Sequence, residues 1–354
     1  MIQVLLGANE YDITNRVSKH FTKKEFRTLQ RDGIIISNYK FTIENSDKVF
    51  SVNRDKSFFS NPDTIYNTPI KIKSNDVIVW QGIIKNVFEK PNDIAVDIET
   101  IDQFYDTIHQ KVEYASGGYE GFGDIVKNVF DTYNINYNTG AMERSIALYD
   151  AASCEAEATI TKDDSMDVMS FAEKMAEIGC ADFFTHDGEV YFLAYGDTAG
   201  GITLEDKDFI TFDSISLNEK DIINEYRIYH AAGGPEIDAD NNNIGEASRN
   251  KYGTRELKEM KTGTEEIITL KDSTSAVYLG ENYIKRSHIL QNGLYSNIPL
   301  WVQFSLDIEL DQYTTVLDRV TVNFTPNNIN SEFQVMKKDV DYNSNTIRIE
   351  ALQR

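Results

Sequence analysis

The sequence predicts an α+β fold that is mainly β, with antiparallel β domains at the two ends of the chain and an α+β module inserted between them. Tyr and Phe occur 19 times each, and together with many Ile and Val residues they favour strands. Short apolar runs that alternate with polar residues fill the first and last parts of the chain. Helical spacing of apolar residues is concentrated in the middle.

The length of 354 residues is too great for one ordinary core and favours two or three domains. We expect a first β domain in residues 1–105, an α+β module in residues 106–211 and a second β domain in residues 212–354. Apolar residues make up 41% of the chain, which is enough to bury a core. Residues 231–255 are polar and rich in Gly and Asn, so they predict a long surface loop within the second β domain.

The first domain is predicted to be an antiparallel meander that closes a small barrel or sandwich. Two strand-like runs, Ile70–Lys73 and Val77–Trp80, flank a Ser-Asn-Asp turn. The run Gly82–Phe88 then passes through a Lys-Pro-Asn-Asp turn into alternating Ile94, Val96 and Ile98. Further strands are expected at Val4–Leu6, Ile34–Ile36 and Tyr39–Ile43.

Two helices and a hairpin are predicted in the middle module. Apolar residues of Gly123–Tyr133 recur at helical spacing, and Ser165–Ile178 forms a second helix with Asp164 as N-cap and Gly179 at its C-terminal end. An Asp-Gly turn at 187–188 separates two apolar runs between residues 181 and 193, which is a strong hairpin signal.

Strands return in the last part of the chain. One helix interrupts them, at about Ser273–Ser287, with Asp272 or Ser273 as its cap. The strand-like pattern begins again at Phe209. The predicted strands after it are Asn224–Tyr229, Glu266–Leu270, Leu300–Ile308, Val320–Phe324, Phe333–Val340 and Thr346–Leu352.

The two ends of the chain resemble each other. Ile70–Ile72 resembles Val320–Val322, Ile83–Glu89 resembles Val335–Asp341, and Val96–Glu99 resembles Ile347–Glu350. The three pairs occur in the same order, about 250 residues apart. Alternating strands also resemble each other by chance, so the pattern is compatible with coincidence, but its order and spacing favour two related β domains.

The charge balance bears on the partners of the protein. Lys and Arg number 35 against 57 Asp and Glu, which gives a net charge of −22. This argues against stable binding of nucleic acid and against an anionic membrane surface. No stretch is long and apolar enough to predict membrane insertion, and no secretory leader is predicted. Cys154 and Cys180 are far apart and fit two small buried residues in a reducing compartment.

No catalytic motif is found, and we predict that the protein is not an enzyme and needs no cofactor or metal. The chain has no GxSxG, P-loop, HExxH or metal-spaced Cys/His cluster. The alternative is a carbohydrate-cleaving enzyme on a β scaffold, which would use acid pairs such as Asp163–Asp164 or Glu265–Glu266. Single aromatic residues in strands belong to a core or an interface. The candidate contacts to partners are Trp80, Tyr252, Arg255 and Trp301.

Three stretches resemble the hub family of phage tails. They are the opening β domain with FSVNRD (50–55) and WQGIIKNV (80–87), the helix and hairpin of residues 163–192, and the run from NEYRIY (224–229) to the C-terminus. The family includes the baseplate hubs of contractile, Mu-like phages, their counterparts in phage-derived bacteriocins and injection systems, and the N-terminal part of some tail-associated proteins.

The resemblance implies a homotrimer in which each chain contributes two tail-tube-like β domains. Six such domains would form a ring that joins the tail tube to the central spike. The implied partners are the tail tube or distal tail protein, the tape-measure protein and a separate spike, since Arg354 follows directly after the last predicted strand. The implied location is the virion tail or baseplate, assembled in the bacterial cytoplasm. Another β-rich tail or baseplate protein is a second alternative.

Overall fold

The structure is a computed structural model of the whole chain. It describes residues 2–17, 22–26, 38–52, 58–59, 65, 68–74, 77–89, 94–102, 110–161, 164–186, 189–197, 201–217, 222–231, 237–238, 243–260, 262, 266–341 and 344–354. The predicted strand Ile34–Ile36 and the acids Asp163 and Glu265 lie outside these residues. The predicted α+β, mainly β fold is confirmed.

Among the described residues, the bounded elements of the first β unit are strands β1 to β7 and the short 3-10 helix η1. Its core is built around Trp80 of the sheet, against which Phe50 and Phe59 from the connection between β4 and β5 are buried. The elements are β1 (Ile2–Leu6), β2 (Tyr11–Asp12), η1 (Thr14–Arg16), β3 (Thr22–Phe26), β4 (Asn38–Glu44), β5 (Pro69–Ser74), β6 (Val77–Glu89) and β7 (Ala95–Asp102).

The second β unit is built from strands near the C-terminus and two that precede them. Its core contains Phe304, Phe333 and the β-branched residues of its last three strands. The elements are β13 (Thr203–Leu204), η3 (Asp206–Asp208), β14 (Phe209–Leu217), β21 (Leu300–Asp307), η7 (Ile308–Tyr313), β22 (Arg319–Phe324), η8 (Thr325–Asn327), β23 (Ile329–Asp341) and β24 (Thr346–Gln353).

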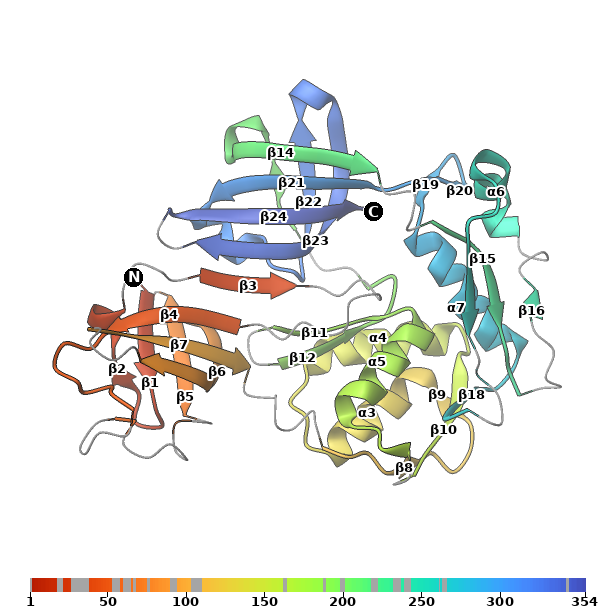
Figure 1. Cartoon of the computed structure of the whole chain (residues 1–354). Helices are drawn as coiled ribbons and strands as arrows, with labels where there is room; N and C mark the ends of the chain where they lie inside the picture. The colour runs from red at the N-terminus through yellow and green to blue at the C-terminus, as the bar shows by residue number, and fades with distance from the viewer. Residues whose placement is uncertain are drawn as a thin grey trace.

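The two units share one sheet. Strands follow the order β14-β21-β24-β23-β3-β4-β7-β6-β5-β1-β2, with β22 and β13 continuing from β23. Strand β3 lies between β23 of the second unit and β4 of the first, antiparallel to both (Figure 1). The units are therefore joined edge to edge by backbone pairing.

The two units have the same strand order. In the first unit the order is β3-β4-β7-β6-β5, and in the second it is β14-β21-β24-β23-β22. The matched long strands β6 and β23 each have 13 residues, and β7 and β24 each have eight. Each long strand has a bulge at the same place, at Lys85 in β6 and at Met336 in β23. The structural match agrees with the repeat seen in the sequence for two of the three pairs of segments. For β6 and β23 it differs from the sequence comparison by one residue, because Glu89 corresponds to Val340 and not to Asp341.

The middle module packs against the second unit through its hairpin, strands β11 and β12 (Figure 1). Its own core is a separate cluster built around Phe122, Tyr149 and Phe171. Phe184 and Tyr191 of its hairpin instead enter the core of the second unit. The elements are β8 (Tyr114–Ala115), β9 (Glu120–Gly121), α3 (Phe122–Thr132), α4 (Thr139–Ala151), β10 (Glu155–Ile160), α5 (Val168–Gly179), β11 (Asp182–His186) and β12 (Glu189–Leu193).

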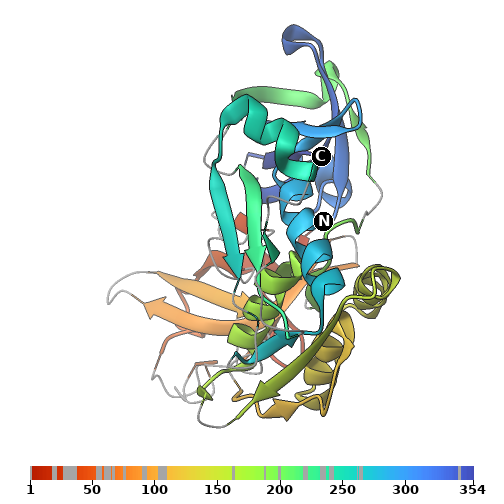
Figure 2. The same ribbon diagram turned by 90° about the vertical axis from the view of Figure 1, so that its right-hand side faces the viewer.

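Residues 222–298 are a second insertion, between β14 and β21. Although they lie within the range predicted for the second β domain, Tyr226, Leu270 and Tyr283 pack in the core of the middle module. Figure 2 shows this segment, in teal and light blue, facing the viewer. Its elements are β15 (Ile223–Ile228), β16 (Ile237–Asp238), η6 (Asn243–Gly245), α6 (Glu246–Tyr252), β17 (Glu256–Met260), β18 (Ile268–Leu270), α7 (Ser273–Arg286), β19 (Ile289–Gln291) and β20 (Leu294–Asn297).

Several local predictions need correction. Residues 231–255 are not simply a surface loop, because residues 246–252 form helix α6 and Ser248 on it is buried. The N-cap of α5 is Asp167, whose carboxylate accepts the Ser170 N–H at 2.8 Å, and Asp164 instead accepts from Thr161. Helix α4 was not predicted, whereas the Asp272 cap of α7 is confirmed.

Candidate interaction surfaces

The joint between the units is a strand pair on one side of β23. The first half of that side, residues 329–334, pairs with β22. The second half pairs with β3, from Lys337 opposite Phe26 to Asp341 opposite Thr22. The bulge at Met336 lies between the two halves, and such bulges bend a strand and end pairing on one side. Two strands therefore follow each other along the same edge of β23.

A carboxylate stands beside the bulge in both units. In the first unit Glu99 forms an ion pair with Lys40 and accepts a hydrogen bond from Asn86 at 2.8 Å, and these contacts lower its pKa. In the second unit Glu350 accepts from Lys337 at 2.9 Å and from Gln303 at 3.2 Å. The repeat thus preserves a polar contact across three neighbouring strands on the solvent-facing side of the sheet.

In the second unit, the Lys337 ammonium beside the bulge keeps its positive charge. Partial burial of Lys337 acts to lower its pKa, but the hydrogen bond to Glu350 and the charge of Asp339 outweigh burial, so the pKa is raised. Lys337 therefore stays protonated at the residue where pairing with β3 begins.

Strand β14 is an edge of the sheet. It pairs with β21, and in the part of the chain that the structure describes it has no second strand partner. Its first half is anchored by aromatic stacking, with the Phe212 ring 4.0 Å from that of Phe324. Its second half is open: Ile215 is 36% exposed and Leu217 is 59% exposed. An open edge with exposed apolar residues is a template for pairing with another strand.

A shallow depression lies on the polar face of this edge. It is lined by Ser214, Ser216, Leu217, Trp301, Val302, Gln303 and Glu350. Ser216 is directly opposite Trp301 in the β14–β21 pair, so a small side chain stands beside a large partly buried ring. The depression is therefore open at the edge of the sheet, where a neighbouring strand would lie.

The far half of β6 is a second open edge. Strand β5 pairs with β6 as far as Ile83, and no described strand continues along that side beyond it. Phe88 projects there with 53% exposure. Glu89 is fixed by hydrogen bonds from the Ser51 hydroxyl at 2.7 Å and the Val52 N–H at 2.9 Å. Burial acts to raise the pKa of Glu89, but these hydrogen bonds and the charge of Lys48 outweigh it and lower the pKa.

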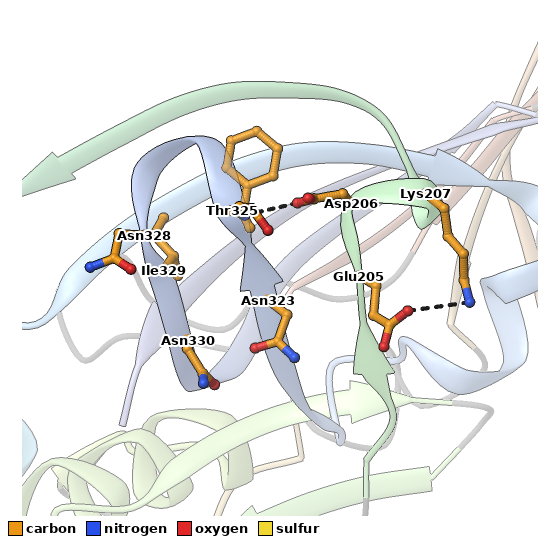
Figure 3. Close-up of a pocket in the computed structure, with 9 residues that line it drawn as sticks. Glu205, Asp206, Lys207, Asn323, Thr325, Asn328, Ile329 and Asn330 are labelled. Carbon is orange, nitrogen blue, oxygen red and sulfur yellow. Dashed lines mark hydrogen bonds and ion pairs between the residues drawn. The ribbon is translucent and has the colours of Figure 1, made fainter.

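A polar pocket lies between η3 and η8, at the end of the second unit (Figure 3). Its acidic residues already have structural partners, since Asp206 accepts the Thr325 N–H at 2.8 Å and Glu205 forms an ion pair with Lys207 at 3.3 Å. Within the described ranges, no group of three or more His, Cys, Asp or Glu residues could hold a metal ion. The pocket offers amide and hydroxyl groups for contact with a polar surface.

The four candidate contact residues do not form one surface. Trp80 is fully buried in the core of the first unit, and a side chain on Gly82 would collide with its ring. Trp301 lies in the depression beside β14. Tyr252 is partly buried at the end of α6, where the Lys251 ammonium lies 5.0 Å from its ring centre, and Arg255 is exposed nearby. Their roles in binding stay predictions. The open edges at Ile215, Leu217 and Phe88 were not found from the sequence.

A buried ion pair fixes the second insertion to the middle module. Arg286 of α7 pairs with Asp182 of β11, and their side chains are 8% and 5% exposed. The Arg286 guanidinium also donates to the Cys180 carbonyl oxygen at 3.4 Å. Cys180 and Cys154 are free and buried, and burial raises the pKa of the Cys180 thiol to about 11. The thiols are therefore protonated and shielded at neutral pH.

No model of a known protein family matches the chain, and no curated protein matches it either. Solved structures do. The 43 kDa tail protein of prophage MuSo2 from Shewanella oneidensis has a TM-score of 0.57 at 10% identity, covering 100% of this chain and 98% of that chain.

Two further tail proteins are similar over almost the whole length of the chain. The prophage tail protein gp18 from Listeria monocytogenes EGD-e has a TM-score of 0.56 at 10% identity, covering 99% of this chain and 94% of that one. The tail protein from Neisseria meningitidis MC58 has a TM-score of 0.55 at 9% identity, with 99% and 96% coverage.

The chain therefore has the fold of phage and prophage tail proteins, as the sequence resemblance led us to expect. Among the described residues, no helix is long and apolar enough to cross a membrane.

Proposed function

We propose that the protein is a structural baseplate hub of a phage-type tail, a homotrimer that forms a pseudo-sixfold ring between the tail tube and a separate central spike. The observation that carries this proposal is the duplicated β unit: one chain holds two units of the same strand order, joined edge to edge. Three copies would supply six such units, which matches a sixfold cylinder on one side and a threefold spike on the other.

The fold shared with tail proteins supports a structural role in a tail or baseplate. The proposed partners are the tail tube or distal tail protein, the tape-measure protein and the spike. We place the protein in the virion tail after assembly in the bacterial cytoplasm. The net charge of −22 supports a ring that does not retain DNA passing near it.

The oligomeric state tests the proposal. Sedimentation velocity or mass photometry of the purified protein is expected to give a particle of three times the chain mass of 40.3 kDa. Electron microscopy of that particle is expected to show a ring with six similar lobes. A protein that is monomeric at its highest soluble concentration would refute the ring. Hydrolysis of peptidoglycan or polysaccharide, lost on replacing a pair of acids, would instead establish the alternative of a carbohydrate-cleaving enzyme.

A further inference from the structure

Within the chain, β3 of the first unit pairs with residues 337–341 of β23 in the second unit. Because the units are repeats, each of these two strand edges has a counterpart in the other unit, and among the described residues neither counterpart has a strand partner. Strand β3 of the first unit corresponds to β14 of the second, because each is the outer neighbour of the matched strands β4 and β21. The half of β23 that holds β3 corresponds to residues 86–89 of β6. After β3 and β23 have paired, the outer edge of β14 and the edge of β6 at residues 86–89 are still open.

We infer that β14 of one copy pairs antiparallel with residues 86–89 of the next copy, repeating between chains the joint that β3 and β23 make within one. The inference deepens the proposed function and rests on it for the closure of the ring at three copies. A head-to-tail joint of this kind uses different surfaces on the two partners and generates a ring when the rotation closes.

The internal joint also fixes the register. Lys23 of β3 lies opposite Val340 of β23. In the repeat, Ile215 of β14 corresponds to Lys23, as judged from the pairing with β21 and β4. Glu89 of β6 corresponds to Val340, as judged from the pairing with β7 and β24. Ile215 of one copy is therefore opposite Glu89 of the next. Continuing along the antiparallel pair, the next positions place Ser216 opposite Phe88 and Leu217 opposite Val87.

The side chains are complementary at two of these positions, Ser216 opposite Phe88 and Leu217 opposite Val87, while the Glu89 carboxylate keeps its hydrogen bonds to Ser51 and Val52 of its own chain. Directly opposite residues in an antiparallel pair point to the same face of the sheet. Phe88 is 53% exposed, and in this register its ring would lie over Ser216 and fill the depression beside Trp301. On the other face, Leu217 would meet Val87, which already packs against the core of the first unit. Both exposed apolar groups would be removed from water.

Cysteine cross-linking of the full-length protein tests the register. The double variant Ser216→Cys/Phe88→Cys places one new thiol on each edge, and a directly opposite pair has a Cα separation of about 4.5–5.5 Å, within reach of a disulfide. The matched control is Ser214→Cys/Phe88→Cys, in which the thiols are diagonal and Cα atoms about 7–8 Å apart are too distant. The native thiols Cys154 and Cys180 are buried and do not compete.

Mild oxidation is expected to give disulfide-linked dimers and closed trimers in the first variant, at roughly tenfold higher yield than in the control. Thermal melting of the reduced variants checks that both are folded, and the mass of each particle is measured in parallel. A trimer that does not cross-link, or that cross-links equally in the control, overturns this joint and leaves the ring standing. Both variants lack the Phe88 ring, so they are oxidised at a concentration at which each is trimeric. A wild-type protein that stays monomeric at its highest soluble concentration overturns the ring and the joint together.

Discussion

Removing the Phe88 ring should weaken the proposed trimer without weakening the folded chain. The side chain is 53% exposed, so about half of its surface is available to be buried by a neighbour. Full burial of a Phe side chain is worth about 1.5–3 kcal/mol, and half of it about 1 kcal/mol. A ring of three copies contains three identical joints, so Phe88→Ser is expected to cost about 3 kcal/mol per trimer. This corresponds to a roughly 100-fold higher dissociation constant.

A dilution series followed by sedimentation velocity or mass photometry measures this shift. Tyr11→Ser is the matched control, because Tyr11 is an aromatic residue of the same unit that is 62% exposed on β2, away from both open edges. The thermal midpoint of both variants should stay close to that of the wild type, since neither ring is buried in the chain. Equal dissociation of wild type and Phe88→Ser, or an equal effect of Tyr11→Ser, would show that Phe88 is not at the joint.

Three further predictions concern the chain itself. Asp182→Ala leaves the Arg286 guanidinium buried without its carboxylate and should reduce the free energy of unfolding by about 3–5 kcal/mol in urea titrations. Asp131→Ala removes an exposed ion pair with Lys127 and a hydrogen bond from Tyr137, and should cost no more than about 1.5 kcal/mol. Equal losses would contradict the burial argument. Cys154 and Cys180 should not react with a thiol reagent at pH 8 until the protein is denatured, because burial raises both pKa values; rapid labelling of the native protein would argue against it. The pKa of Glu99 is lowered in the folded state, so its ionised form stabilises the fold above the unfolded pKa of about 4.3, and that contribution is lost as pH falls through the folded value. Between pH 5 and pH 3 the wild type should therefore lose up to about 1 kcal/mol more than Glu99→Gln in thermal melts, and parallel pH profiles would count against it.

The fold class and most strands could be predicted from the sequence because they follow local rules. The alternating runs from Ile70 to Ile98 and from Val320 to Leu352 each bury one face, so their periodicity indicates strands directly. The match between these runs also indicated the repeat. Asp272 was predicted as a helix cap because capping depends on residues only three positions apart.

The surfaces were harder to predict because they depend on long-range pairing. The segment Thr22–Phe26 has no alternating apolar pattern, and its place in the sheet is set by a partner from the far end of the chain. The exposure of Phe88 could not be known without knowing where β5 stops pairing. Trp80 was considered as a contact residue because a lone Trp fits an interface as well as a core, and only the packing shows that it is buried.

The position of β3 also affects how the chain is made. Residues 22–26 leave the ribosome early, but the strand that holds them on one side, residues 337–341, is among the last to be synthesised. Contacts between such distant segments are slow to form. During almost all of translation, β3 therefore lacks its partner strand β23. A truncated product that lacks β23 would leave this edge of β3 unpaired, and we expect it to be more sensitive to proteases than the full chain.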